Sequence, residues 1–223
     1  MPAATVVFDL DGTLVDTAPD LVDTLNVVFA HEGLPPVPFA TARNLIGGGA
    51  RRMIERGLQA EGRSYTPPEI DRLFARFIDY YSAHIADRSR PFPALEAALD
   101  SLAADGARLA VCTNKLERLS VRLLDTLGLA HRFHAVCGQD TFGVQKPNPE
   151  FLRATIRRAG GDAAWAVMVG DSANDIDAAR AAGVPVVAVD FGYTETPVSR
   201  LKPDRIISGF GELPAAVRDL LAR

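Results

Sequence analysis

The feature that most constrains the fold is a series of short apolar, β-type runs separated by stretches of helical character. Continuous apolar strands that alternate with helices are typical of a parallel sheet covered by helices on both faces. We therefore expect an α/β fold of the doubly wound, Rossmann-like kind. The runs are TVVFDL near the start, RLAVCT at 108–113, HAVCG near 134, WAVMVG at 165–170, VPVVAVD at 184–190 and DRIIS near 204.

A long helical interval separates the first of these runs from the second. It contains LVDTLNVVFAHEG, ARRMIERGLQAEG and PPEIDRLFARFIDYYSAHIA. In the last of these, Ile70, Leu73, Phe74, Phe77 and Ile78 recur at helical spacing, and we interpret them as the core-facing side of a helix. The sequence thus predicts a helical domain over residues 17–85, inserted into an α/β core formed by residues 1–16 and 86–223.

Polar residues follow the predicted strands at the edge where their carboxyl ends should meet. Open parallel sheets bind their ligands at this edge. Four acids, hydroxyl groups and lysines gathered there are what metal-assisted phosphoryl transfer requires. The segments are Asp9 to Thr13, Thr113 to Lys115, Gln145 to Pro147, and Gly170 to Ser172 with Asp175.

Asp9 and Asp11 lie two residues apart directly after the first strand. Two such carboxylates repel each other unless a cation or a proton offsets their charge. Mg²⁺ takes oxygen ligands, so Asp9, a nearby backbone carbonyl and Asp171 are candidate ligands. One aspartate of the pair can then attack phosphorus while the other moves protons. The alternative for this motif is an Asx-type turn or a helix cap at Asp11-Gly12.

Asp171 and Asp175 follow the WAVMVG strand, where we expect a helix to begin. A lone Asp-Ser at a helix start is usually an N-cap. The second acid four residues on favours a metal site, and we expect both acids on one helical face.

Lys146 stands between Gln145 and Pro147, beside this acidic cluster, in a chain with three lysines and 21 arginines. The alternative is a solvated surface charge, but we interpret it as an electrostatic clamp on nucleophile and phosphate. The Thr113 hydroxyl is a candidate donor to a phosphate oxygen, and the backbone N–H groups of Gly12 and Asn114 would add to the same cradle.

Composition narrows the range of partners. The net charge of −4 gives no basic footprint for nucleic acid, and no apolar run reaches the ~18 residues of a membrane helix. Cys112 and Cys137 lie in short apolar runs and are interpreted as reduced packing residues. We therefore expect a cytoplasmic protein, monomer or homodimer, without a nucleic-acid or membrane partner. The phosphoryl-transfer residues at the strand ends imply that its partner is a small phosphorylated metabolite.

Taken in order, the motifs resemble those of the haloacid dehalogenase-like superfamily over essentially the whole chain. They are Asp9-x-Asp11-Gly12-Thr13, Thr113, Lys146 and Gly170-Asp171-x-x-x-Asp175. The resemblance implies Asp9 as the nucleophile that forms an aspartyl-phosphate and Asp11 as the general acid/base. It also implies Mg²⁺ held by Asp9, the Asp11 carbonyl and Asp171 with support from Asp175, and a helical cap over the active site.

Two branches of that superfamily fit poorly. Dehalogenases attack carbon and lack the second aspartate, which is present here as Asp11. The phosphonatase branch uses a cap lysine to form a Schiff base, but residues 17–85 contain no lysine. Phosphate ester chemistry is therefore the expected activity.

Within the phosphatases, the chain resembles the phosphoglycolate phosphatase family. The resemblance rests on DLDGTLVDTAPDL, IGGGARRMIERGL, CTNKLERLSVRLLDTLGL and VGDSANDIDAARAAGVPVVAVDFGYT. It implies 2-phosphoglycolate as substrate, with Gly48 and Gly49 in a cap loop that faces the active site. Those glycines could instead simply separate two helices.

Arg51, Arg52 and Arg56 follow this loop, and Arg56 is our candidate for binding a substrate carboxylate, against the alternative of a solvated arginine. Other hypotheses remain open: another small substrate such as a sugar phosphate or pyrophosphate, a phosphomutase of the β-phosphoglucomutase type, and a phospho-accepting receiver domain. The position of the acceptor on the first strand and the helical insertion both count against a receiver.

Overall fold

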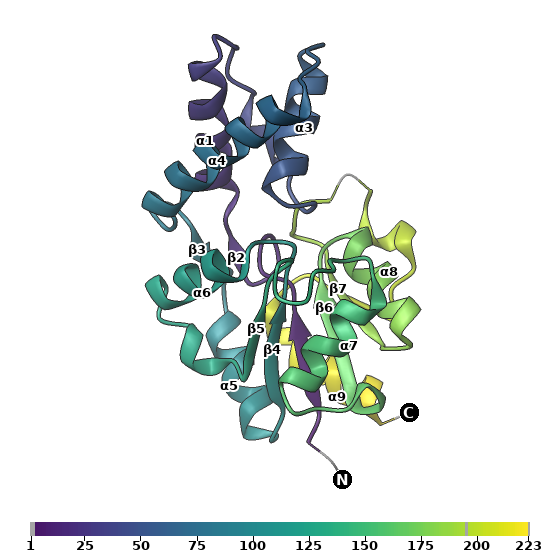
Figure 1. The fold of residues 1–223 in the computed structure, drawn as a ribbon. Helices are drawn as coiled ribbons and strands as arrows, with labels where there is room; N and C mark the ends of the chain where they lie inside the picture. Colours follow the sequence, from purple (N-terminus) through teal and green to yellow (C-terminus); the bar gives the residue numbers. More distant parts are fainter. Residues whose placement is uncertain (1–2, 195, 223) are drawn as a thin grey trace.

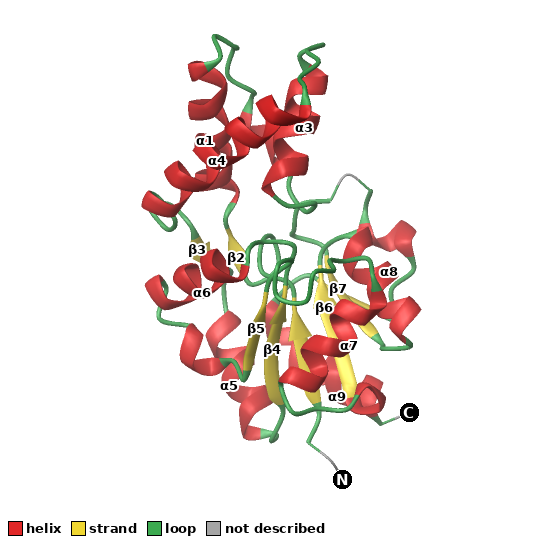
Figure 2. Cartoon of the chain, viewed as in Figure 1, coloured by secondary structure: helices red, strands yellow, loops and turns green. Residues whose placement is uncertain are grey.

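The computed structural model describes residues 3–194 and 196–222. Within these residues, six strands form one parallel sheet in the order β5-β4-β1-β6-β7-β8 (Figures 1 and 2), which confirms the predicted doubly wound α/β core. Each strand falls on one of the apolar runs. The strands are β1 (Thr5–Phe8), β4 (Arg108–Cys112), β5 (Ala135–Cys137), β6 (Ala166–Gly170), β7 (Val186–Val189) and β8 (Arg205–Ile207).

Helices cover both faces of this sheet because successive strand side chains point to opposite sides. On β1, Val6 and Phe8 pack into one apolar cluster and Val7 into the other. The first cluster includes residues of α5, α6 and α9, and the second includes residues of α7 and α8. The bounds are α5 (Leu95–Ala104), α6 (Glu117–Thr126), α7 (Pro149–Arg158), α8 (Ala173–Ala182) and α9 (Leu213–Leu221).

A second group of helices forms a lobe beyond the carboxyl edge of the sheet (Figure 1). The three helical stretches expected between the first two strands are present, although α2 was not anticipated. The helices are α1 (Ala18–His31), α2 (Phe39–Arg43), α3 (Ala50–Ala60) and α4 (Pro67–Ala83). None of the described helices is long and apolar enough to cross a membrane.

The chain enters and leaves this helical lobe through a short antiparallel pair, β2 (Val15–Asp16) and β3 (Arg90–Pro91). The sequence did not predict this pair, because two-residue strands are too short to show a period. Short 3₁₀ helices complete the described secondary structure at Ala130–Arg132, Ala163–Trp165, Val198–Leu201 and Phe210–Glu212.

Candidate active site

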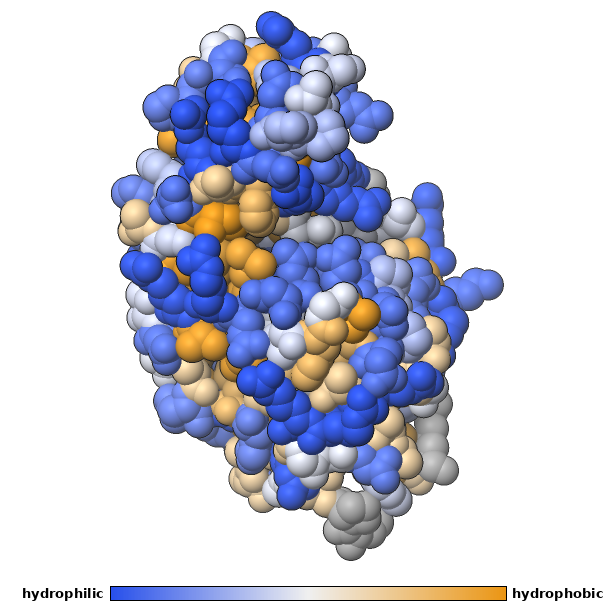
Figure 3. All heavy atoms as spheres, viewed as in Figure 1, coloured by the Kyte–Doolittle hydropathy of each residue, from blue (hydrophilic) through white to orange (hydrophobic). Residues whose placement is uncertain are grey.

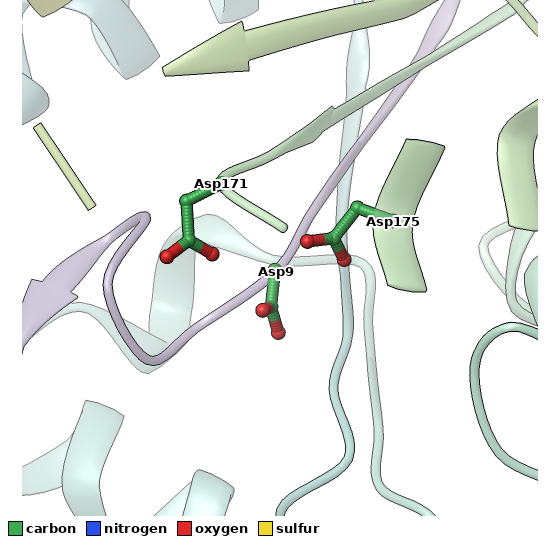
Figure 4. Close-up of side chains that lie close together, drawn as sticks. All are labelled: Asp9, Asp171 and Asp175. Carbon is green, nitrogen blue, oxygen red and sulfur yellow. The ribbon is translucent and has the colours of Figure 1, made fainter. Parts of the chain in front are cut away.

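Three carboxylates from separate positions in the sequence converge at the carboxyl edge of the sheet. Asp9 follows β1, Asp171 follows β6 and Asp175 lies in the first turn of α8. One oxygen of each lies within 4.8 Å of the others, and all three residues are buried. Figure 4 shows the three carboxylates close together. The predicted convergence of these acids is therefore present in the structure.

The start of α8 fixes two of these acids, but not on one helical face as expected. Asp171 precedes the helix, and Ser172 is its N-cap. Asp175 completes a capping box: one oxygen accepts hydrogen bonds from the Ser172 backbone N–H at 3.0 Å and its hydroxyl at 2.7 Å. The expectation of a shared face was wrong because Asp171 belongs to the strand end. The cap and the cluster thus use the same residue, Asp175.

Lys146 is the cation of this cluster. Its Nζ lies 2.8 Å from an Asp9 oxygen and 2.6 Å from an Asp175 oxygen, and the residue is 2% exposed. Asn114 fixes its backbone from both sides: the Asn114 Oδ1 accepts from the Lys146 N–H at 2.9 Å, and the Asn114 Nδ2 donates to the Lys146 carbonyl at 3.1 Å. The Asn114 side chain therefore positions the lysine.

Burial dominates the electrostatics of the cluster. It raises the pKa of Asp9 to about 6 despite the opposing charge of Lys146, and Asp175 adds to the rise. The pKa of Asp171 also lies well above its ordinary value, first through burial and then through Asp175 and Asp9. When ionised, three carboxylates and one ammonium carry a net charge of −2. This excess of negative charge is what a divalent cation would neutralise.

Asp11 lies outside the carboxylate cluster. Its side chain accepts hydrogen bonds from Lys115 Nζ at 2.8 and 2.9 Å, and from the Thr17 hydroxyl at 2.7 Å. Burial lowers the pKa of Lys115, but Asp11 outweighs it and the net shift is upward. The proposed nucleophile and its neighbour therefore face different cations: Asp9 faces Lys146, and Asp11 faces Lys115.

Gly12 and Thr13 support Asp171. Gly12 has φ of +82°, and a Cβ there would lie 2.5 Å from an Asp171 oxygen and 2.8 Å from the Tyr193 ring. The Thr13 hydroxyl donates to Asp171 at 3.2 Å. A glycine is thus required at position 12 by both backbone and space. Thr113 is buried in the same region, and its hydroxyl accepts from the Lys115 backbone N–H at 3.2 Å.

A pocket of about 40 Å³ lies between Asp9, Asp11 and the helical lobe. Its lining includes Thr113, Asn114 and Gly49 from the predicted site, whereas Gly48 lies outside it. The helical side is largely apolar, and Figure 3 shows apolar surface at this junction of lobe and body. Apolar lining residues from the lobe are Ile46, Met53, Phe74, Phe77 and Ile78. The α4 face interpreted as helix packing therefore also forms a wall of the pocket.

Arg56 does not line this pocket. With Gly48, it borders a neighbouring hollow of about 520 Å³ that also contains Arg52, Ser172 and Asn174. The structure thus brings together the predicted core residues, and places Arg56 and Gly48 next to them on a different surface.

Three residues of the site were not among the predicted ones. Lys115 was noticed as one of few lysines at a strand end, and Tyr81 was hidden in the helical apolar pattern. Tyr193 carries no sequence signal: its backbone N–H donates to Asp171 at 2.6 Å, and its hydroxyl bonds to Asp16 and accepts from the Ala18 N–H at 3.0 Å. It connects Asp171 to the entrance of the helical lobe.

The doubly wound sheet, with buried acids and a lysine at its carboxyl edge, defines an α/β enzyme. A family model described as haloacid dehalogenase-like hydrolase matches residues 6–189, and the chain belongs to this family.

Similar proteins carry a more specific description. A phosphoglycolate phosphatase of Caulobacter vibrioides is 50% identical over 218 residues, covering 98% of this chain and 92% of that protein. One from Mesorhizobium japonicum is also 50% identical, covering 98% and 96%. The crystal structure of a predicted phosphoglycolate phosphatase from Haemophilus somnus superposes with a TM-score of 0.88 at 30% identity, covering 96% of this chain and 97% of that one.

Proposed function

We propose that the protein is a Mg²⁺-dependent phosphomonoesterase that hydrolyses 2-phosphoglycolate to glycolate and phosphate. The observation that carries the proposal is the convergence of Asp9, Asp171 and Asp175 around Lys146 at the end of β1. The similarity to phosphoglycolate phosphatases over nearly the whole chain supports the choice of substrate.

The donor set fits Mg²⁺. All three converging side chains offer carboxylate oxygens, which are the hard ligands this ion prefers, and their excess charge of −2 matches a divalent cation. Asp9 and Asp171 would hold the ion with the Asp11 backbone carbonyl, and Asp175 would support them. Bound there, Mg²⁺ would offset the charge of the phosphate oxygens and of the acids themselves.

Asp9 would attack phosphorus in line with the leaving oxygen. An Asp9 oxygen forms the new bond to phosphorus as the ester P–O bond breaks, which leaves a phospho-aspartate. Lys146 lies 2.8 Å from Asp9 and would stabilise the charge that develops on the phosphoryl group, beside Thr113.

Asp11 would move the protons. It donates a proton to the leaving oxygen of glycolate, and in the second step removes one from the water that attacks the phospho-aspartate. Lys115 and Thr17 hold its carboxylate in a fixed orientation beside the pocket. The two aspartates thus have separate roles because each has its own hydrogen-bond partners.

The helical lobe lies directly over the acids. Its residues and the strand ends line one narrow pocket together, so entry of a phosphorylated acid and release of its product would require the lobe to move. Residues 17–85 would act as a cap that opens at the β2/β3 pair to admit substrate and closes to exclude bulk water. Gly49 and Tyr81 would approach the substrate from this cap.

The test is a panel of kcat/KM values, measured with Mg²⁺, for 2-phosphoglycolate, sugar phosphates, pyrophosphate and p-nitrophenyl phosphate. We expect multiple turnovers and the highest kcat/KM for 2-phosphoglycolate. A better substrate within the panel would overturn the substrate assignment. Return of the phosphoryl group to a sugar bisphosphate would indicate a mutase, and release of a single equivalent of product would indicate a receiver domain.

A further inference from the structure

Among the residues that the structure describes, the buried Tyr81 hydroxyl makes no hydrogen bond of regular geometry, and its nearest charged group is the Lys115 ammonium. The residue lies near the end of α4, is 1% exposed and lines the same pocket as Asp9 and Asp11. Burying a hydroxyl group without a hydrogen-bond partner costs free energy. A phenylalanine at the same position would avoid this cost. An unsatisfied donor facing a pocket therefore points to a ligand group that it meets there.

Lys115 lies directly against Tyr81. Its Nζ is 4.6 Å from the centroid of the Tyr81 ring, and its side chain is 6% exposed. Burial raises the pKa of Tyr81 to about 12, with Lys115 acting in the opposite direction, so the phenol is neutral and able to donate. The two side chains offer an O–H donor from the helical lobe and a cation from the core, a few ångströms apart.

The rest of the pocket lining contains no other cationic side chain among the described residues. Its lobe side is formed largely by Leu21, Ile46, Met53, Phe74, Phe77 and Ile78. Of the neutral polar side chains in the lining, Asn114 is bonded to the Lys146 backbone and Thr113 accepts from the Lys115 N–H, whereas Gln139 offers an uncharged amide. In pockets of this kind, a few placed polar groups fix the orientation of the ligand.

We propose that Tyr81 and Lys115 together bind the carboxylate of the substrate, and so select short phosphomonoesters that end in a carboxylate. The Tyr81 hydroxyl donates one hydrogen bond, and the Lys115 ammonium donates a charge-assisted one. This rests on the proposed function and adds the residues that determine its specificity.

The geometry also limits the length of the substrate. Lys115 binds Asp11, which lies two residues from Asp9, so the carboxylate site is next to the site of phosphoryl transfer. A short substrate would therefore place its carboxylate here while its phosphate lies at Asp9. Because Tyr81 belongs to the lobe and Lys115 to the core, the site is complete when the lobe is closed, which couples recognition to closure.

The test compares two substrates that differ at one end. 2-Phosphoglycolate carries a carboxylate, and 2-hydroxyethyl phosphate carries a neutral hydroxyl in its place. We expect Tyr81→Phe to lower the ratio of kcat/KM values, carboxylate over hydroxyl, by about tenfold, mainly through KM for 2-phosphoglycolate. Tyr81→Phe is the cleaner variant because Lys115 also contacts Asp11.

Tyr80→Phe is the matched control. Tyr80 is on the same helix, but its ring stacks on His84 and it does not line the pocket, so the ratio should equal that of the wild type. The melting temperature of Tyr81→Phe should change little, because the ring and its packing are kept. An unchanged ratio in Tyr81→Phe would overturn the role proposed for Tyr81 and Lys115, but not the substrate assignment. A wild-type enzyme without preference for 2-phosphoglycolate would instead overturn the substrate assignment on which it rests.

Discussion

The two walls of the pocket differ in polarity. The core wall contains the largely buried charged side chains of Asp9, Asp11 and Lys115, which are held in ion pairs, with Lys146 as the partner of Asp9. The cap wall, formed by residues of α1, α3 and α4 with Ile46, is largely apolar apart from the Tyr81 hydroxyl. This difference supports the proposal that the strand ends, where rigid backbone fixes charge, carry out the chemistry, and that the helical lobe contributes to selection among substrates.

The largest expected effect comes from removing the nucleophile from the core wall. Asp9→Asn should lower kcat by more than about 10⁴-fold, because the carboxamide cannot form the phospho-enzyme. The fold should remain, since Lys146 keeps Asp175 as a partner. Steady-state kinetics measure kcat, and circular dichroism measures whether the fold is retained. Near-normal turnover in Asp9→Asn would assign the chemistry to another group.

The core wall should also depend on its lysine for stability. Lys146→Met leaves buried carboxylates unpaired, and we expect a loss of about 3–5 kcal/mol in the free energy of unfolding near neutral pH without Mg²⁺. Urea denaturation measures the change. Lys202→Met is the matched control, because Lys202 is exposed, and should change stability by less than about 0.5 kcal/mol. Equal effects of the two variants would contradict the role of Lys146.

Stability without Mg²⁺ should fall as the pH rises. The pKa of Asp9 is about 6 in the fold against 3.8 for the ordinary group, so the folded state holds the proton more tightly. The contribution of Asp9 is thus greatest below 3.8 and is lost as the pH rises to about 6, a change of about 3 kcal/mol.

Mg²⁺ should reverse this loss. We expect a larger rise in melting temperature on adding Mg²⁺ at about pH 7.5 than at about pH 5, where protons compete with the ion. Thermal unfolding scans in EDTA and in Mg²⁺ measure this rise. Asp171→Asn should make the rise smaller. A Mg²⁺ response that is equal at both pH values would contradict the carboxylate site.

A smaller difference in stability is expected between two glycine substitutions, one in the core and one in the helical lobe. Gly12 and Gly62 both have positive φ, of +82° and +65°, but a Cβ at Gly62 meets nothing within 4 Å. Gly62→Ala in the helical lobe should therefore cost only backbone strain, about 1–2 kcal/mol. Gly12→Ala should cost about 1–3 kcal/mol more through its clash with Asp171, and should weaken the response to Mg²⁺. Equal losses of stability would show that position 12 tolerates a side chain.

The sequence predicted the core wall better than the cap wall for a physical reason. Asp9, Lys146 and Asp171 each follow an apolar run, and the rule that parallel strands share one carboxyl edge brings them together without knowledge of packing. Tyr81 lies on a helix whose apolar period describes packing equally well, so its role depends on what the helix faces. Tyr193 contacts Asp171 through a backbone N–H, which no residue type reveals.

The sequence pattern also failed to predict the shortest helices and strands and the direction of some side chains. The five-residue α2 and the two-residue strands β2 and β3 show no period. The spacing of Asp171 and Asp175 suggested a helical face, but the helix begins at Ala173, so the shared direction comes from the turn between strand and helix.

The most direct test of the account is to trap the phosphoryl group on the core wall. Asp11→Asn should slow hydrolysis of the intermediate, and acid quenching after addition of 2-phosphoglycolate and Mg²⁺ should leave a phosphorylated enzyme. Borohydride reduction converts an aspartyl-phosphate to homoserine, which mass spectrometry of peptides can locate. We predict homoserine at position 9, and none in the Asp9→Asn, Asp11→Asn double variant. Homoserine at another position, or turnover with no phosphorylated enzyme in any quench, would contradict the assignment of Asp9 as the nucleophile.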